Sequence, residues 1–145
     1  MNKSEIIIEG DFEDGALIAI YKGLRAGHLH FFDNGEGVAC LGDIKVFGAN
    51  DVKPGLLERI IHIAGMRRYN GFRNRGIGTA LLSRFFELAR KNNVKRIYGL
   101  VVVSDLDDTP SLLQWYVGHC FIILPPDQEC IANAKHKIEL TFMDR

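Results

Sequence analysis

The stretch Arg73-Asn74-Arg75-Gly76-Ile77-Gly78-Thr79 is a glycine-punctuated turn that leads directly into an apolar, periodic segment. Gly76 and Gly78 have no Cβ atom, so a ligand can approach the backbone closely and either residue can adopt a positive φ at little cost. The first N–H groups of a helix lack partners within the helix and lie at the positive end of its dipole. The stretch therefore predicts a site for phosphate or another anion, and Arg73 and Arg75 add positive charge beside it.

The residues that follow the turn predict a helix and then a buried strand. From Gly76 to Lys91 the apolar side chains recur at helical spacing, and Asn92-Asn93 ends the segment. The run Arg96–Val103 is almost entirely apolar, as expected for a strand covered on both faces of a sheet. The anion-binding turn thus lies at the start of the most strongly predicted helix in the chain.

The chain before the turn predicts mainly short strands. Five segments are predicted to be strands from their β-branched residues or from alternating apolar and polar residues: Ile6–Ile8, Ala16–Leu24, Gly27–Phe32, Val38–Phe47 and Leu56–Arg68. The alternation is only loose in Gly27–Phe32. The last of the five segments also suits one face of a helix, but Gly65 inside the run favours a strand with a bulge. We expect an acidic turn at Asp11–Gly15 and a hairpin turn at Asp33–Gly37.

The end of the chain predicts a loop, a short helix and two further strands. Asp105–Asp108 is expected to be an acidic loop, and Thr109-Pro110 to be an N-cap followed by proline at the first helical position. The helix is expected over Ser111–His119, and the strands over Phe121–Leu124 and Lys137–Met143.

Composition narrows the class of protein. The 145 residues fit one α/β domain spanning residues 1–145, with 47% hydrophobic and 25% charged residues. The 18 basic and 18 acidic residues cancel, which gives no global argument for a nucleic-acid or membrane partner.

The location is expected to be cytoplasmic. The N-terminus has no basic region followed by a long apolar run, and no segment approaches the roughly 18 apolar residues of a membrane span. The three cysteines are odd in number and share no metal-binding spacing, as expected for reduced thiols.

Two familiar phosphate-binding motifs do not fit the turn. A P-loop ends in Gly-Lys followed by Ser or Thr, whereas Gly78-Thr79 has no intervening lysine. A dinucleotide-binding fingerprint needs three glycines and an acidic residue about 20 positions further on. Only two glycines are suitably placed, and Arg96 stands where the acid is needed.

The pattern Arg-x-x-Gly-x-Gly at Arg73–Gly78, followed by an amphipathic helix, resembles the coenzyme A pyrophosphate loop of the GNAT superfamily of acetyl-CoA-dependent N-acyltransferases. Ala80-Leu81-Leu82 continues as in the family's phosphate-binding helix, and Ile97–Val103 matches its next strand. Trp115-Tyr116 with Phe121 matches the end of its second conserved block. The resemblance extends over about Leu56–Leu124 and is weak before it.

The resemblance implies a fold and a cofactor. The fold is a mixed, strongly twisted β-sheet flanked by helices, here with reduced N-terminal helices because Asp11–Gly15 is too short to hold them. Acetyl-CoA is the implied co-substrate, without a metal. Its pantetheine arm would lie between Ile60–Arg68 and Ile97–Val103, paired with main-chain groups like an added strand. The implied cofactor-binding residues are Met66, Arg67, Arg68, Arg73, Asn74, Arg75, Gly76, Ile77, Gly78 and Thr79.

The resemblance also implies a reaction, the transfer of the acetyl group to a primary amine by direct attack on the thioester. A bulge near Gly65 would turn a backbone N–H toward the thioester oxygen and stabilise the oxyanion. Tyr116 matches the family tyrosine that acts as general acid or holds the thiol sulfur, because a phenol of pKa about 10 stays protonated at neutral pH. The alternative for Tyr116 is a packed side chain beside Trp115.

The general base is left open between Glu58, His62 and a bound water. Family members often use a carboxylate on the strand before the phosphate loop. His62 has an unperturbed pKa near 6.5, but a strand histidine is more often structural, and Glu58 can equally be a solvated charge.

Other polar residues carry weaker hypotheses. His28 and His30 share one face of a strand, which could suit a metal, but no third ligand has compatible spacing. Cys120 stands where the family usually has glycine, and Thr109 where it often has asparagine. The acidic residues Asp105–Asp108 are expected to be solvated, although they could attract a cationic amine.

Three functions follow from these residues. The first is an N-acetyltransferase acting on a small amine or on a peptide or protein amine, and a homodimer is plausible because a second subunit could complete the acceptor side. The second is an acyl-CoA-binding sensor or assembly module without transferase activity. The third is a nucleic-acid binder that uses Arg67, Arg68, Arg73 and Arg75, which the neutral charge balance disfavours.

Overall fold

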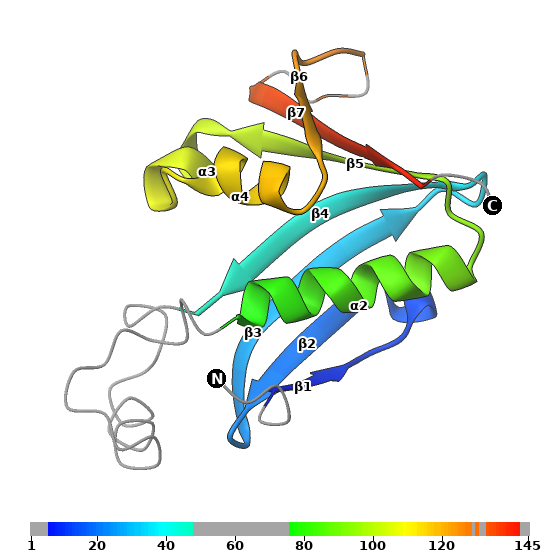
Figure 1. The fold of residues 1–145 in the computed structure, drawn as a ribbon, viewed down its shortest axis with the longest axis vertical. Helices are drawn as coiled ribbons and strands as arrows, with labels where there is room; N and C mark the ends of the chain where they lie inside the picture. Colours follow the sequence, from blue (N-terminus) through cyan, green and yellow to red (C-terminus); the bar gives the residue numbers. More distant parts are fainter. Residues whose placement is uncertain (1–5, 48–75, 129, 131–132, 143–145) are drawn as a thin grey trace. The chain divides into compact units, whose positions relative to one another are not determined.

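The computed structural model describes residues 6–47, 76–128, 130 and 133–142. The elements follow in the order β1 (Ile6–Glu9), η2 (Phe12–Asp14), β2 (Ala16–Tyr21), β3 (Leu24–Asp33), β4 (Val38–Val46), α2 (Ile77–Lys91), β5 (Arg96–Val102), α3 (Val103–Asp108), α4 (Leu112–Gly118), β6 (Ile122–Leu124) and β7 (Ala134–Thr141). The strands form one sheet in the order β1-β2-β3-β4-β5-β7-β6, in which β4 and β5 run parallel. The mixed, twisted α/β sheet expected from the sequence is confirmed (Figure 1).

The chain divides into two compact units, each described by itself. The first comprises Met1–His30 and Asp43–Leu88, and the second comprises Phe31–Gly42 and Ala89–Arg145. No described helix has the length and apolar content that crossing a membrane requires. The expected strand at Leu56–Arg68 lies outside the described residues.

In the first unit, α2 covers one face of the paired strands β2 and β3 (Figure 1). Alternation along β2 buries Leu17 and Ala19, which pair with Leu29 and Gly27. A Cβ atom on Gly27 would lie 3.5 Å from the Ile77 side chain, so this face of the strands meets the start of α2. The apolar stripe of α2 is fully buried, as its spacing predicted: Ile77, Leu81, Leu82 and Phe85.

The N-terminal strands are separated by short turns. Asp11 caps the single turn η2, and Gly15 ends it in the left-handed conformation, so no long helix lies between β1 and β2. The expected strand Ala16–Leu24 is wrong at its end, because β2 stops at Tyr21. Lys22 and Gly23 both have positive φ and form a two-residue hairpin turn into β3.

In the second unit, β5 lies between β4 and β7. Val38–Leu41 pairs in parallel with Arg96–Gly99, and β7 pairs antiparallel with β5. Ile97 and Val101 are buried, as the apolar run predicted. The last strand begins at Ala134, three residues earlier than expected, because β7 pairs with β5 along its full length.

The expected loop at Asp105–Asp108 is wrong, because these residues belong to α3. The Asp105 carboxylate accepts a hydrogen bond from the Val102 N–H at 3.0 Å, so an acidic side chain in the first turn starts the helix. Thr109 does not cap the next helix either. Its N–H donates to the Asp105 carbonyl at the end of α3, and Ser111 occupies the N-cap position of α4.

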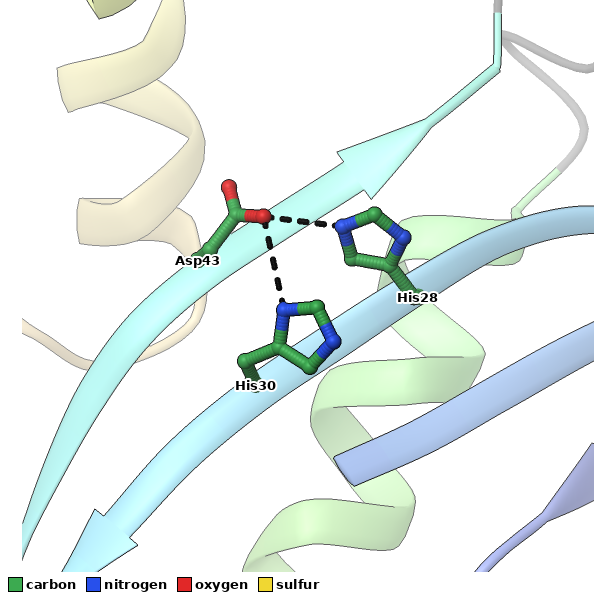
Figure 2. Close-up of side chains that lie close together, drawn as sticks. All are labelled: His28, His30 and Asp43. Atoms are coloured by element: carbon green, nitrogen blue, oxygen red, sulfur yellow. Dashed lines mark hydrogen bonds and ion pairs between the residues drawn. The ribbon is translucent and has the colours of Figure 1, made fainter. Parts of the chain in front are cut away.

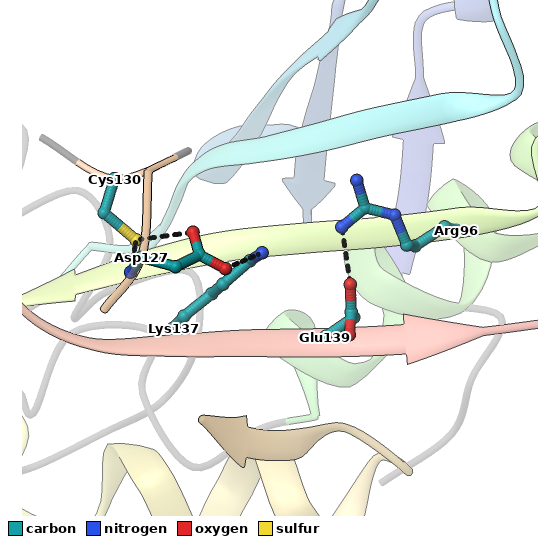
Figure 3. A network of polar contacts seen from close by, with 5 residues as sticks. All are labelled: Arg96, Asp127, Cys130, Lys137 and Glu139. Atoms are coloured by element: carbon teal, nitrogen blue, oxygen red, sulfur yellow. Dashed lines mark hydrogen bonds and ion pairs between the residues drawn. The ribbon is translucent and has the colours of Figure 1, made fainter. Parts of the chain in front are cut away.

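Among the described residues of the second unit, one charged side chain is buried, and Figure 3 shows the polar contacts around it. Lys137 on β7 is 3% exposed, and its Nζ lies 2.8 Å from Oδ2 of Asp127. Arg96 on β5 pairs with Glu139 on β7. Both cations also lie 5.3 Å from the centre of the Tyr98 ring. The charged pairs therefore link β5, β7 and the segment before β7.

Candidate functional site

The glycine turn at the start of α2 has the geometry that an anion-binding helix terminus needs. Gly76 has a φ of 77°, in the left-handed region that glycine adopts without strain, and its carbonyl accepts the Ala80 N–H at 2.9 Å. The first turn of α2 carries no acidic side chain, whereas its last turn carries Arg90 and Lys91. The N-terminal end of α2 therefore keeps the positive character of the helix dipole.

Of the predicted cofactor-binding residues, the structure describes only Gly76, Ile77, Gly78 and Thr79. The remaining predicted site residues before the helix lie outside the described part of the chain, and their roles stay predictions: Glu58, His62, Met66, Arg67, Arg68, Arg73, Asn74 and Arg75.

Tyr116, the predicted general acid, lies on α4 in the second unit. The residue is 6% exposed, and its ring centre lies 5.2 Å from that of Trp115 and 5.4 Å from that of Phe121, both in edge contacts. A phenol so enclosed is held by packing, as a side chain that donates a proton at a defined position must be. The same packing is what a purely structural tyrosine would show, so the catalytic role stays a prediction.

The end of α4 fixes the position of Tyr116. The Tyr116 carbonyl accepts the Phe121 N–H at 3.1 Å, and the Val117 carbonyl accepts the Cys120 N–H at 3.0 Å. These bonds form a Schellman motif, in which the residue after the cap adopts the left-handed conformation. Cys120 occupies that position with a φ of 74°, which explains why the family usually places glycine there.

Among the described strands, β5 lies between β4 and β7. The expected parallel neighbour, Ile60–Arg68, lies outside the described residues; within them β4 is the parallel neighbour of β5 and β7 is its antiparallel neighbour. The placement of Ile60–Arg68 beside Ile97–Val103 therefore stays a prediction. Pairing with β4 ends at Leu41 and Gly99, whereas pairing with β7 continues to Val102.

A second polar cluster lies in the first unit, on β3 and β4 (Figure 2). Oδ2 of Asp43 lies 2.8 Å from Nε2 of His28 and 3.7 Å from Nδ1 of His30. The sequence identified the two histidines but missed Asp43 as their partner. The signal was present in the hairpin turn at Asp33–Gly37, because residues equally far from such a turn on either strand lie side by side.

The sequence of the chain matches a known protein family. The sequence pattern described as "Acetyltransferase (GNAT) family" matches residues 4–112, which is more than half of the chain. This chain belongs to the GNAT acetyltransferase family. The resemblance carried by the glycine turn is therefore confirmed, and this GNAT protein is an acyltransferase by family.

Solved structures share the fold at low sequence identity. Ard1 from Thermoplasma volcanium superimposes with a TM-score of 0.61 at 17% identity, covering 92% of this chain and 74% of that one. PaiA N-acetyltransferase from Thermoplasma acidophilum, in complex with coenzyme A, has a TM-score of 0.58 at 13% identity; the match covers 88% of this chain and 60% of that one. Diaminobutyrate acetyltransferase EctA from Paenibacillus lautus, in complex with L-2,4-diaminobutyric acid and coenzyme A, has a TM-score of 0.53 at 14% identity. The match covers 92% of this chain and 75% of that one. A search of curated proteins found no match.

Proposed function

We propose that this GNAT protein transfers the acetyl group of acetyl-CoA to a primary amine by direct attack of the amine on the thioester. The observation that carries the proposal is the junction of Gly76 and α2, where a left-handed glycine opens a fifteen-residue helix whose first turn has no acidic side chain. Membership of the acetyltransferase family supports the same reaction class.

The coenzyme would be held mainly by main-chain donors. The N–H groups of Ile77 and Gly78 belong to the first turn of α2, and such groups have no partner within the helix, so they can donate to a pyrophosphate. Arg73 and Arg75 would add charge from the preceding residues. Two of the similar structures carry coenzyme A, which supports this cofactor for the present chain.

The reaction consists of an addition and an elimination. The deprotonated amine adds to the thioester carbonyl and forms a tetrahedral intermediate, and the carbon–sulfur bond then breaks to release the amide and the thiolate of coenzyme A. Tyr116 would give its phenolic proton to the thiolate, and a base would take the proton from the amine. Glu58, His62 or a water molecule would supply that base.

The proposal is tested by measuring binding and turnover separately. Calorimetry with acetyl-CoA should show saturable binding, and thiol release should follow on at least one amine of a panel that includes L-2,4-diaminobutyric acid, a polyamine and a short peptide. Tight binding without thiol release on any amine would instead support a CoA-binding module without transferase activity.

The role of Tyr116 has its own test. We expect Tyr116→Phe to lower kcat by about 10²-fold, the scale of losing a general acid, while leaving acetyl-CoA binding unchanged. Trp115→Phe is the matched control, since it changes the packing beside the ring and keeps the phenol. Equal kcat values for Tyr116→Phe and wild type would remove Tyr116 from the mechanism.

The acceptor side is proposed to be completed by a second subunit. Between β1 and β2 the structure has only the three-residue turn η2, so no helix there can wall off an acceptor. Light scattering after gel filtration should give twice the 16.3 kDa mass of the chain. A monomer that turns over amines would show that the acceptor side is open.

A further inference from the structure

The cluster His28, His30 and Asp43 has no role in the proposed acetyl transfer. The two histidines stand two residues apart on β3, and Asp43 reaches them from β4 (Figure 2). Their side chains offer one ligand atom each, and these atoms all lie within 4.8 Å of one another. The two neighbouring strands thus bring two imidazoles and a carboxylate together.

The spacing of the donor atoms suits a small metal ion. Zinc binds imidazole nitrogen and carboxylate oxygen at about 2.0–2.2 Å, so two ligand atoms in a tetrahedral site lie roughly 3.3 Å apart. The distances from Oδ2 of Asp43 to the two imidazole nitrogens, 2.8 and 3.7 Å, bracket this value. The imidazole rings are stacked with centres 4.4 Å apart, so the two histidines lie side by side on one face of the strand.

The three side chains differ in burial: His28 is largely buried, whereas His30 and Asp43 are about half exposed. The side chain of His28 is 14% exposed and packs edge-on against Phe47, with ring centres 5.7 Å apart. The side chains of His30 and Asp43 are 49% and 55% exposed, so an ion can enter from solvent. One ligand is therefore held by the protein interior while two can adjust around the ion.

Only one of the two ring nitrogens of His28 has a hydrogen-bond partner among the described residues. Within the described part of the chain its Nδ1 is buried without a hydrogen-bond partner, although buried polar atoms normally have one. The other ring nitrogen, Nε2, is aimed at Asp43. The ring is thus oriented by the cluster and not by a complete hydrogen-bond set of its own.

We propose that His28, His30 and Asp43 bind a divalent transition-metal ion of the zinc class, with solvent in the fourth position. Two imidazoles with one carboxylate form a donor set that suits zinc, whereas calcium and magnesium prefer oxygen ligands throughout. The ion would cross-link β3 to β4.

The proposed metal site is independent of the proposed acetyl transfer. Gly27 faces Ile77 of α2, and side chains alternate along β3, so His28 and His30 lie on the opposite face of the strand. The ion would therefore lie on the face that α2 does not cover, away from the helix terminus proposed for the pyrophosphate. Failure of one proposal leaves the other untouched.

The test is a titration of the full chain, freed of metal by a chelator, with zinc chloride followed by calorimetry. We expect about one equivalent to bind, and His30→Asn and Asp43→Asn each to weaken the affinity by at least about tenfold. His136→Asn is the matched control, since it removes a histidine of β7 outside the cluster and should bind zinc like wild type.

A second readout separates loss of a ligand from loss of fold. Cobalt(II) should give visible absorption bands of a low-coordinate site in wild type, and these bands should be lost in Asp43→Asn while its far-UV circular dichroism is unchanged. Absence of zinc binding would overturn the proposal. So would binding that survives Asp43→Asn and His30→Asn but disappears when the three cysteines are replaced.

Discussion

Three residues other than glycine adopt a positive φ in the described part of the chain: Lys22, Asn93 and Cys120. Lys22 belongs to a two-residue hairpin turn, and the other two follow the ends of α2 and α4. Asparagine tolerates the left-handed conformation better than most residues because its short side chain can bond locally. Cys120 has no such compensation, so this position carries backbone strain.

Replacing Cys120 by glycine should therefore stabilise the protein. We expect Cys120→Gly to raise the free energy of unfolding by about 0.5–1 kcal/mol, because relief of the left-handed residue outweighs the greater unfolded-state entropy of glycine. Urea denaturation measures the change. Cys120→Ala removes the thiol but keeps Cβ, and should show no gain; an equal gain in both variants would attribute the effect to the thiol.

Any residue other than glycine at position 76 would be strained for the same reason. With a φ of 77°, Gly76→Ala should cost about 1–2 kcal/mol at the start of α2 and weaken acetyl-CoA binding about tenfold. Calorimetry with acetyl-CoA measures the affinity. Gly118→Ala is the control, because a Cβ there meets nothing within 4 Å. Unchanged affinity in Gly76→Ala would argue against the coenzyme lying on this turn.

At the scale of elements, the connections from α2 to β5 and from α4 to β6 use the same device. After α2, the Val94 N–H donates to the Ala89 carbonyl and the Asn93 N–H to the Arg90 carbonyl, which is again a Schellman motif. Val94 and Ala89 are both buried, so the motif also fixes the direction in which the chain enters β5. The same arrangement leads from α4 to β6.

The pairing of β3 with the end of β4 depends on a close approach at Gly27. A Cβ atom there would lie 2.5 Å from the Lys45 carbonyl oxygen, which is backbone and cannot rotate away. We expect Gly27→Ala to lower the free energy of unfolding by about 1–3 kcal/mol, the usual cost of overpacking. Urea denaturation tests this, and wild-type stability in Gly27→Ala would show that β3 and β4 lie further apart.

At the scale of the whole molecule, the free energy of unfolding is only about 5–15 kcal/mol, so a single buried charge can change a large fraction of it. The 18 basic and 18 acidic residues cancel overall, but Lys137 is almost fully buried and forms an ion pair with the half-exposed Asp127. Removing one partner of such a pair leaves a desolvated charge, whereas removing the charge itself does not.

Asp127→Asn should therefore lower the free energy of unfolding by about 1–3 kcal/mol, while Lys137→Met should remain close to wild type. Denaturant titration of both variants makes the comparison. A larger loss in Lys137→Met would mean that the lysine contributes mainly through its contact with Tyr98.

The sequence by itself determined the glycine turn, the amphipathic helix and the buried strand that follows. Gly76 adopts the positive φ that glycine allows, the apolar stripe of α2 is buried, and β5 spans almost the predicted residues. These features depend on local backbone freedom and on side-chain periodicity, which are properties of neighbouring residues. The family, too, follows from this local pattern.

Only the tertiary structure decided which distant residues meet. It placed Asp43 beside His28, made β4 the parallel neighbour of β5, and buried Lys137 against Asp127. Each result depends on how segments that are separated in the sequence pack against one another. The turn at Asp33–Gly37 could have predicted the meeting of Asp43 with His28, but the other two contacts join segments that no short turn connects, so a local reading of the chain could not supply them.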